Sequence, residues 1–147
     1  MNVEERMDYV RYRLERSNQA LQAAAANLRE ELLNDAVNRL YYACFYAVSA
    51  LLILNGHESS KHSGVRSLFE QHFVKPGLFP RHFGRFYHQL FDSRQDGDYE
   101  DFMAFEKGIV EEWLQVSRAF IGAISEAIAS APKGTPLPTH DKSPSSE

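Results

Sequence analysis

The stretch "DAVNRLYYACFYAVSALLILNG", residues 35–56, decides the fold of this chain. Apolar residues recur in it at helical spacing, and its second half is apolar over most of the helical circumference. A helix of that kind is buried on nearly all sides, so we expect it at the centre of the protein. Asn34 is expected to cap the helix at its start, and Asn55-Gly56 to end it after Leu54.

The sequence on both sides of this stretch predicts further helices. Residues 3–28 carry one apolar stripe at alternating steps of three and four, and Asn2 with Glu5 has the pattern of a capping box. No segment shows the sustained alternation of a strand. We therefore expect an all-α, up-and-down bundle of four or five helices over residues 1–131. The expected helices span residues 3–28, 34–54, 62–74, 80–94 and 100–131.

The junction between the last two helices, residues 95–99, and the C-terminal segment are expected to lie outside the helices. In "FDSRQDGDYEDF", residues 91–102, Gly97 is expected to close one helix and Asp98 to cap the next. The last segment, "PKGTPLPTHDKSPSSE", is rich in proline, serine, threonine and charge. That composition is typical of disorder, so residues 132–147 are expected to form a disordered C-terminal tail.

Composition favours a cytoplasmic protein without a membrane span. Hydrophobic residues make up 44% of the 147 residues and charged residues 24%, which is ordinary for a globular domain. The single cysteine, Cys44, lies in an apolar run and fits a small core residue in a reducing compartment. The longest apolar run, "ACFYAVSALLIL", is shorter than the ~20 residues of a membrane helix. The charged, periodic N-terminus is not typical of a signal peptide.

Charge is distributed unevenly along the chain, whose net charge is −4. Residues 57–94 carry six basic and three acidic groups, together with five of the six histidines. Residues 95–147 carry four basic and ten acidic groups. The middle of the chain therefore favours an anionic partner, unless the excess is a solvated face that arose by chance.

Several kinds of active site have no counterpart in the sequence. It contains no glycine-rich phosphate loop, no Gly-x-Ser-x-Gly elbow and no Glu-x-x-His. Its histidines are never three or four residues apart, so no helix offers a pair of histidine ligands. We expect neither a metal site nor a cofactor.

The remaining polar residues suit phosphodiester chemistry without a metal, or nucleotide binding alone. An arginine can grip a phosphate, and a phenol or imidazole can orient or transfer a proton. Structural roles are open for each residue: Arg94 could pair with Asp96 or Asp98, and His62 could simply begin a helix. Tyr42 could be a ring at the edge of the core, and Asn38 could satisfy a helical neighbour. The candidates are Arg94, Tyr99 and His62 for catalysis, and Asn38, Arg39, Tyr42, Asp98 and Lys61 for binding.

Three segments taken in order, "DAVNRLYYACFYAVSALLILNG", "KHSGVRSLFEQHFV" and "LFDSRQDGDYED", resemble the HEPN family (higher eukaryotes and prokaryotes nucleotide-binding), in its small prokaryotic branch. The likeness covers residues 34–101. It implies an all-α bundle that forms a homodimer, with a polar groove near the dimer axis that binds or cuts RNA. Many members are metal-independent endoribonuclease toxins paired with a nucleotidyltransferase antitoxin.

The family signature is an arginine followed, after four to six residues, by a histidine. Arg94 matches the arginine, and Tyr99 falls where the histidine would be, since no histidine follows before His140. The small branch carries Arg-x-x-(Ala/Gly)-Asp-Tyr in place of the signature, and residues 94–99 match that pattern. The resemblance thus implies an RNA- or nucleotide-binding protein with a possible endoribonuclease activity; a non-catalytic scaffold and a nucleotide sensor are the alternatives.

Overall fold

The computed structural model describes residues 1–99 and 104–131, with side chains placed for residues 1–94 and 104–131. These residues form five α-helices and one π-helical turn, and no strand occurs among them. The all-α prediction is confirmed, whereas the predicted tail at residues 132–147 lies outside the described part. The elements are α1 (Val3–Arg29), α2 (Leu33–Leu54), α3 (His62–Phe69), η1 (Glu70–Val74), α4 (Arg81–Tyr99) and α5 (Lys107–Ser130).

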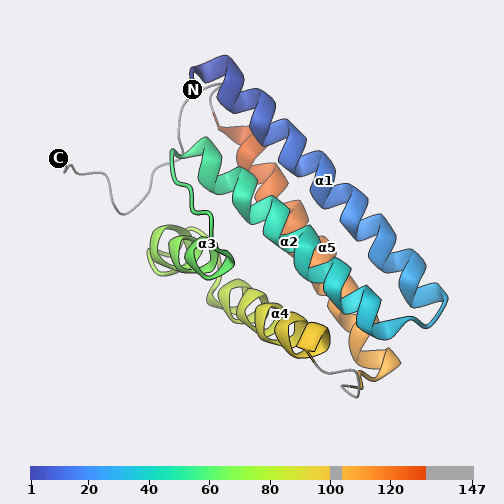
Figure 1. The fold of residues 1–147 in the computed structure, drawn as a ribbon. Coiled ribbons are helices and arrows are strands. Elements are labelled where there is room, and N and C mark those ends of the chain that lie inside the picture. The colour runs from blue at the N-terminus through green and yellow to red at the C-terminus, as the bar shows by residue number, and fades with distance from the viewer. Residues whose placement is uncertain (100–103, 132–147) are drawn as a thin grey trace.

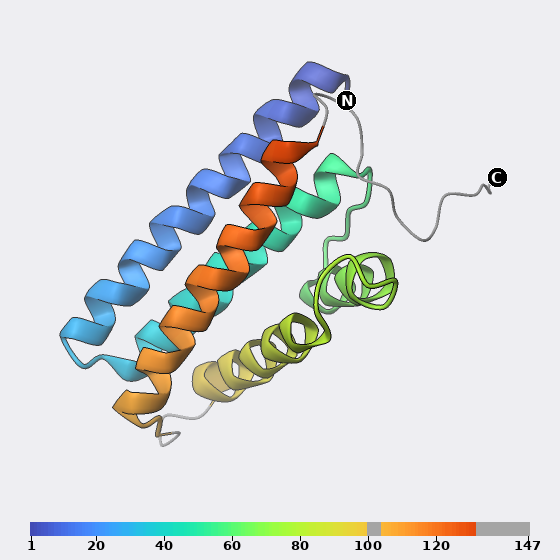
Figure 2. The same cartoon turned by 180° about the vertical axis from the view of Figure 1, so that it is seen from behind.

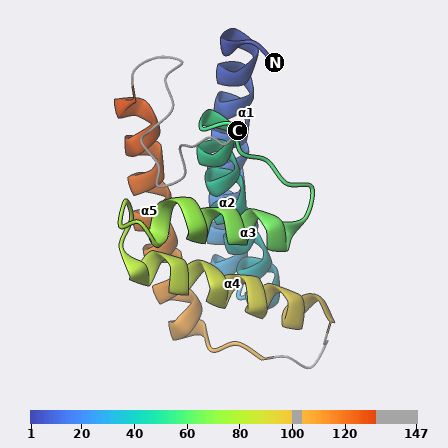
Figure 3. The ribbon, with the colours of Figure 1, turned by 90° about the vertical axis from the view of Figure 1, so that its left-hand side faces the viewer.

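Three long helices lie side by side and a shorter pair crosses them. Helices α1, α2 and α5 pack lengthwise, with α1 antiparallel to the other two (Figures 1 and 2). The segment α3–η1 and helix α4 lie side by side, run in opposite directions and cross α2 (Figure 3). Because α2 touches both groups, the central position predicted for it is confirmed.

Helix α1 begins where the sequence predicts. The Asn2 side chain accepts a hydrogen bond from the Glu5 backbone N–H (2.8 Å), and the Glu5 carboxylate accepts one from the Asn2 backbone (2.9 Å). This reciprocal pair is a capping box. Further along, the Ser17 hydroxyl donates to the Ala43 carbonyl of α2 at 2.7 Å. Such a contact requires the two helices to approach closely, which small residues on both of them allow.

Helix α2 is the core of the molecule. It is long and apolar enough to cross a membrane by length and composition, but 72% of its most apolar window is buried inside the protein. Tyr41, Cys44 and Ala47 have no exposed surface at all. The helix ends as predicted, at Asn55 and Gly56, where Gly56 has a φ of +81° that favours glycine.

The start of α2 differs from the prediction. Its first residue is Leu33, and Leu32 occupies the capping position without a side-chain hydrogen bond, so the predicted cap by Asn34 is wrong. The turn is closed by the backbone instead: the Leu32 N–H donates to the Asn27 carbonyl at 2.8 Å, and Glu31 adopts a positive φ of 60°. Backbone bonds of this kind satisfy helix ends without a capping side chain.

The short helix predicted over residues 62–74 is two elements. An α-helix, α3, passes into the π-helical turn η1, which is closed by a bond from the Lys75 N–H to the Glu70 carbonyl (2.8 Å). The wider turn brings three consecutive residues, His72, Phe73 and Val74, into the core. A π turn depends on that packing, which is why helical periodicity did not reveal it.

The boundary between α4 and α5 also differs from the prediction. Helix α4 continues to Tyr99, so Gly97 does not end it and Asp98 does not cap the next helix. One glycine costs a helix only about 1 kcal/mol relative to alanine, which the rest of the helix can absorb. Helix α5 begins at Lys107 rather than near residue 100, after an extended Glu106.

Aromatic rings of the crossing pair, α3 and α4, pack against a ring of the long helix α5. Phe120 of α5 has no exposed surface and lies 5.8 Å from Phe69 of α3 and 6.0 Å from Tyr87 of α4, between ring centroids. These contacts fix α3 and α4 relative to the bundle. The position of α3 against α2 then determines where the polar residues of both helices meet.

Candidate functional site

The candidate site is built around Tyr41, a fully buried residue of α2. Its ring stacks on that of Tyr87 from α4, with centroids 6.0 Å apart and an interplanar angle of 2°. Its hydroxyl oxygen lies 2.8 Å from Nδ1 of His62, the first residue of α3. One phenol therefore links the core to α3.

His62 is held in place on two sides. Its ring stacks on Phe45 of α2, with centroids 4.5 Å apart and an interplanar angle of 7°. Its Nδ1 is engaged by Tyr41, so Nε2 is the ring nitrogen available to a substrate. The preceding residue, Lys61, occupies the capping position of α3 and is exposed beside this site.

Arg94 reaches the same phenol from α4. Its guanidinium carbon lies 4.9 Å from the centroid of the Tyr41 ring and 5.8 Å from that of Phe91. A second arginine, Arg66 of α3, lies 5.0 Å from the centroid of Phe91. Two guanidinium groups and one imidazole thus converge from α3 and α4 on a patch of aromatic rings.

Burial and charge set the protonation states at the site. Burial raises the pKa of Tyr41 to about 12, although the neighbouring Tyr87 hydroxyl and the Arg94 guanidinium oppose the rise. Burial also lowers the pKa of His62, and the positive charge of Arg94 lowers it further. At neutral pH the phenol is therefore protonated and the imidazole is neutral.

The predicted binding residues of α2 lie beside this cluster. The Arg39 guanidinium carbon is 5.0 Å from the centroid of the Tyr42 ring, and that ring meets His62 edge-on at 5.7 Å. The Asn38 side-chain oxygen is buried and makes no hydrogen bond with the described residues. Arg39 and Tyr42 thus extend the site along α2, and Asn38 leaves one acceptor unused.

Tyr99 and Asp98 are placed only by their backbone. Both lie in the last turn of α4, five and four residues beyond Arg94, and their side chains lie outside the described part of the chain. Arg94 and Tyr99 are therefore on one continuous helix and not on either side of a loop. The structure brings together Arg94, His62, Tyr42 and Arg39, with Lys61 next to them.

Three members of the site were missed from the sequence. Tyr41, Phe45 and Arg66 were not named as candidates. The signal for Tyr41 was present, because a buried tyrosine normally finds a partner for its hydroxyl. Helical spacing on α3 also places Arg66 one turn after His62.

The arrangement can bind a phosphate and move a proton beside it. Guanidinium groups pair with phosphate oxygens, and a neutral imidazole can accept a proton from a hydroxyl. In the described ranges, no group of three or more histidine, cysteine, aspartate or glutamate residues is placed to share a metal ion.

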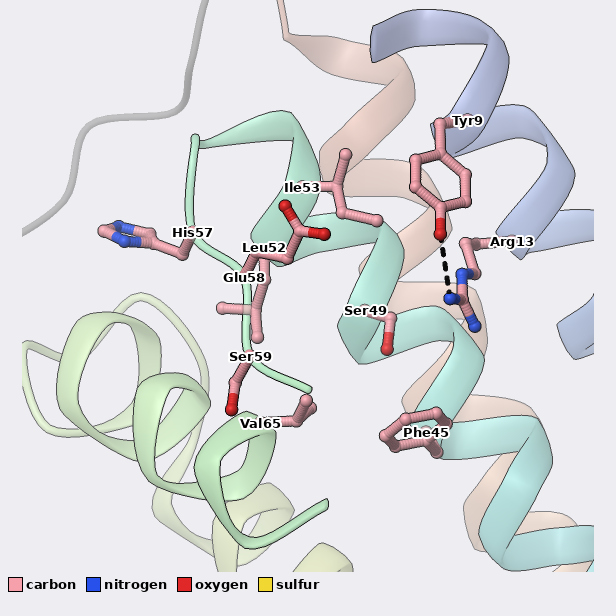
Figure 4. A pocket seen from close by; sticks show the side chains of 10 residues that line it. All are labelled: Tyr9, Arg13, Phe45, Ser49, Leu52, Ile53, His57, Glu58, Ser59 and Val65. Carbon is pink, nitrogen blue, oxygen red and sulfur yellow. Dashed lines mark hydrogen bonds between the residues drawn. The ribbon is translucent and has the colours of Figure 1, made fainter. Parts of the chain in front are cut away.

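A small pocket adjoins the site on the other side of Phe45. It lies between α1, the second half of α2 and the connection to α3, and the Arg13 guanidinium in it donates to the Tyr9 hydroxyl at 3.1 Å (Figure 4). Its volume is about 60 Å³. Pockets for small ligands typically enclose ~300–1,000 Å³, so this one is too small for a nucleotide.

Comparisons with known proteins cover nearly all of the described chain. The family model for the HEPN domain matches residues 10–127. A "UPF0332 protein" of Thermotoga maritima is 41% identical over 128 residues, which cover 87% of this chain and 96% of that protein. "Putative toxin MJ0605" of Methanocaldococcus jannaschii is 30% identical over 115 residues, 78% of this chain and 85% of its own. "Putative toxin MJ0142" of the same organism is 27% identical over 117 residues, 80% of each chain.

Proposed function

This chain belongs to the HEPN family, and we propose that it is a toxin-like protein that binds RNA at the Arg94–Tyr41–His62 site and cuts it without a metal ion. The observation that carries the proposal is that Arg94 and His62, from two different helices, both contact Tyr41. His62 would supply, from α3, the imidazole that the sequence lacks four to six residues after Arg94. Two relatives with toxin in their names support the biological role.

Cleavage would use the RNA's own ribose as nucleophile. Arg94 holds the phosphate and stabilises the charge that develops on its oxygens. His62, neutral at pH 7, accepts the proton of the ribose 2′-hydroxyl through Nε2 while Nδ1–H donates to the Tyr41 oxygen. The bond from the 2′-oxygen to phosphorus forms as the bond to the 5′-oxygen breaks. The leaving 5′-oxygen takes a proton, for which Tyr99 is the candidate donor, and the products are a 2′,3′-cyclic phosphate and a 5′-hydroxyl.

Five further residues would position the strand around the reacting phosphate: Lys61, Asn38, Arg39, Tyr42 and Asp98. Arg39 and Lys61 supply positive charge, and the Tyr42 ring offers a face on which a base can stack. Asn38 is partly exposed beside them on α2, although its side-chain oxygen is buried. We propose that the working unit is a cytoplasmic homodimer, and that a nucleotidyltransferase antitoxin is its regulatory partner.

Tyr99 favours a second candidate function, a non-catalytic RNA-binding module. A phenol has an unperturbed pKa near ~10 against ~6.5 for imidazole, so it transfers protons less readily at neutral pH. In that case Arg94 and His62 would bind the strand without cutting it.

One experiment separates the two candidates. The full-length protein is incubated with a short fluorescein-labelled oligouridylate in EDTA, and binding is followed by anisotropy and cleavage by gel. We expect binding and cleavage in the wild type, and loss of both in Arg94→Ala but not in Arg118→Ala, a control on the exposed face of α5. Binding without cleavage identifies the non-catalytic module. If Arg94→Ala binds and cuts like the wild type, the site is wrong.

A further inference from the structure

A second positively charged feature lies next to the site. It is a groove between α3–η1 and α4, with a volume of about 630 Å³. Four of its lining residues are basic: Arg66 and Lys75 on one side, and Arg81 and Arg85 on the other. We call it the basic groove.

The floor of the basic groove is formed by a close approach of two helices. A side-chain carbon added at Gly84 of α4 would lie 2.7 Å from Oε1 of Glu70 and 3.1 Å from Cγ1 of Val74. Glycine at this position therefore lets α4 approach η1, and the long basic side chains form the walls above. Among the described residues that line the groove, Glu70 is the one acidic residue.

The walls present positive charge at regular intervals. Arg81 and Arg85 are exposed and one helical turn apart on α4, a separation of about 6 Å along the axis. Lys75 is exposed on the opposite wall. His88 also lines the groove, and its Nε2 lies 3.2 Å from a carboxylate oxygen of Asp92. Repeated cationic groups of this kind suit a polyanion with many charges better than a single small ligand.

The basic groove leads to the Arg94–Tyr41–His62 site. Arg66 lines the groove, and its guanidinium lies over the Phe91 ring, which Arg94 also covers. His62 is one turn before Arg66 on α3. A strand bound along the groove would therefore arrive at the proposed site beside Arg66.

We propose that the basic groove binds the phosphate backbone of single-stranded RNA on one side of the phosphate held by Arg94. The inference rests on the proposed function, because it extends the same strand from the same site. Among the described residues that line the groove, the one aromatic ring is the imidazole of His88, which lies against the Asp92 carboxylate. Contacts there would read the charge of the backbone and not the bases, so binding along the groove would be independent of sequence.

The test compares two double variants of the full-length protein that lose the same charge. Arg81→Ala with Arg85→Ala removes two groove cations, and Arg29→Ala with Arg118→Ala removes two exposed cations elsewhere. Affinity for fluorescein-labelled oligouridylate is measured by anisotropy over a range of salt concentrations, after thermal unfolding confirms that both variants fold. The groove variant should reduce the slope of log affinity against log salt by about 0.7 for each arginine. The control should keep the wild-type slope.

Three other outcomes would contradict the inference. If the groove variant keeps the wild-type slope while Arg94→Ala loses binding, the groove inference is wrong and the proposed function stands. If neither the groove variant nor Arg94→Ala changes binding, the proposed function fails as well. If the groove variant loses affinity for fluorescein-labelled oligoglutamate and not for oligouridylate, the groove serves an acidic protein and the inference is wrong.

Discussion

The hydroxyl oxygen of Tyr41 lies 2.8 Å from Nδ1 of His62, so the buried centre of α2 orients the first residue of α3. The same phenol ring carries the Arg94 guanidinium, 4.9 Å from its centroid. Tyr41 is therefore a positioning residue: it fixes the imidazole and the guanidinium relative to each other without itself being exposed.

Removal of the Tyr41 hydroxyl should destabilise the protein. Tyr41→Phe keeps the stacked ring and removes a hydrogen bond, which typically contributes about 0.5–1.5 kcal/mol. We expect the free energy of unfolding, measured with urea, to fall by about 1 kcal/mol. Tyr42→Phe, at the partly exposed neighbouring ring, is the control and should change the free energy of unfolding by less than about 0.5 kcal/mol. Equal losses in both variants would contradict this role for Tyr41.

The charge of Arg94 should be detectable in the titration of His62. Because Arg94 lowers the pKa of His62, Arg94→Gln should raise that pKa. The pKa of His62 should still stay below the ordinary value for histidine, since burial is the larger cause of its lowering. The measurement is an NMR titration of the imidazole carbon-bound protons, with Arg118→Gln as the control. An unchanged or lower pKa in Arg94→Gln would show that the two groups do not interact.

Much of the fold could be predicted from the sequence because buried residues recur at the period of a helix. The buried centre of residues 35–56 and the Asn2–Glu5 capping box were both predictable from local patterns. The end of α4 was not, because the cost of Gly97 in a helix is small and local rules overstate it as a stop signal. The π turn at η1 was not predictable either, since it depends on packing of His72, Phe73 and Val74 between helices.

The site was predictable residue by residue but not as an arrangement. Arg94 and His62 stood out by residue type, 32 positions apart in the sequence. Their proximity depends on how α3 and α4 cross α2, which no spacing rule gives. Tyr41 was not recognised as a site residue because its ring fits the apolar pattern of its helix. Its hydroxyl, however, contacts His62.

The aromatic attachment of the crossing helices should contribute strongly to stability. Phe120 is fully buried against rings of α3 and α4, so Phe120→Ala should reduce the free energy of unfolding by about 3–5 kcal/mol. Ile109 lies on the same helix but is 40% exposed. Ile109→Ala should therefore cost much less. Comparable losses in urea unfolding would contradict the observed orientation of α5.

Cys44 should be inert in the folded protein. Its side chain has no exposed surface, and burial raises the pKa of the thiol to about 12. A thiol-specific reagent such as dithionitrobenzoate should react with it only at the rate of unfolding, with little acceleration between neutral and mildly alkaline pH. Rapid reaction under native conditions would show that the centre of α2 is accessible.

The most direct measurement of the central claim is the NMR signal of His62 during addition of RNA. The ligand is an oligouridylate with methylated 2′-hydroxyls, which can bind but lacks the nucleophile for cleavage. We predict that the His62 ring signals shift along the binding curve and that Arg94→Ala abolishes the shift. Binding of the strand with the His62 signals unmoved, or no binding at all, would contradict the assignment of RNA to the Arg94–Tyr41–His62 site.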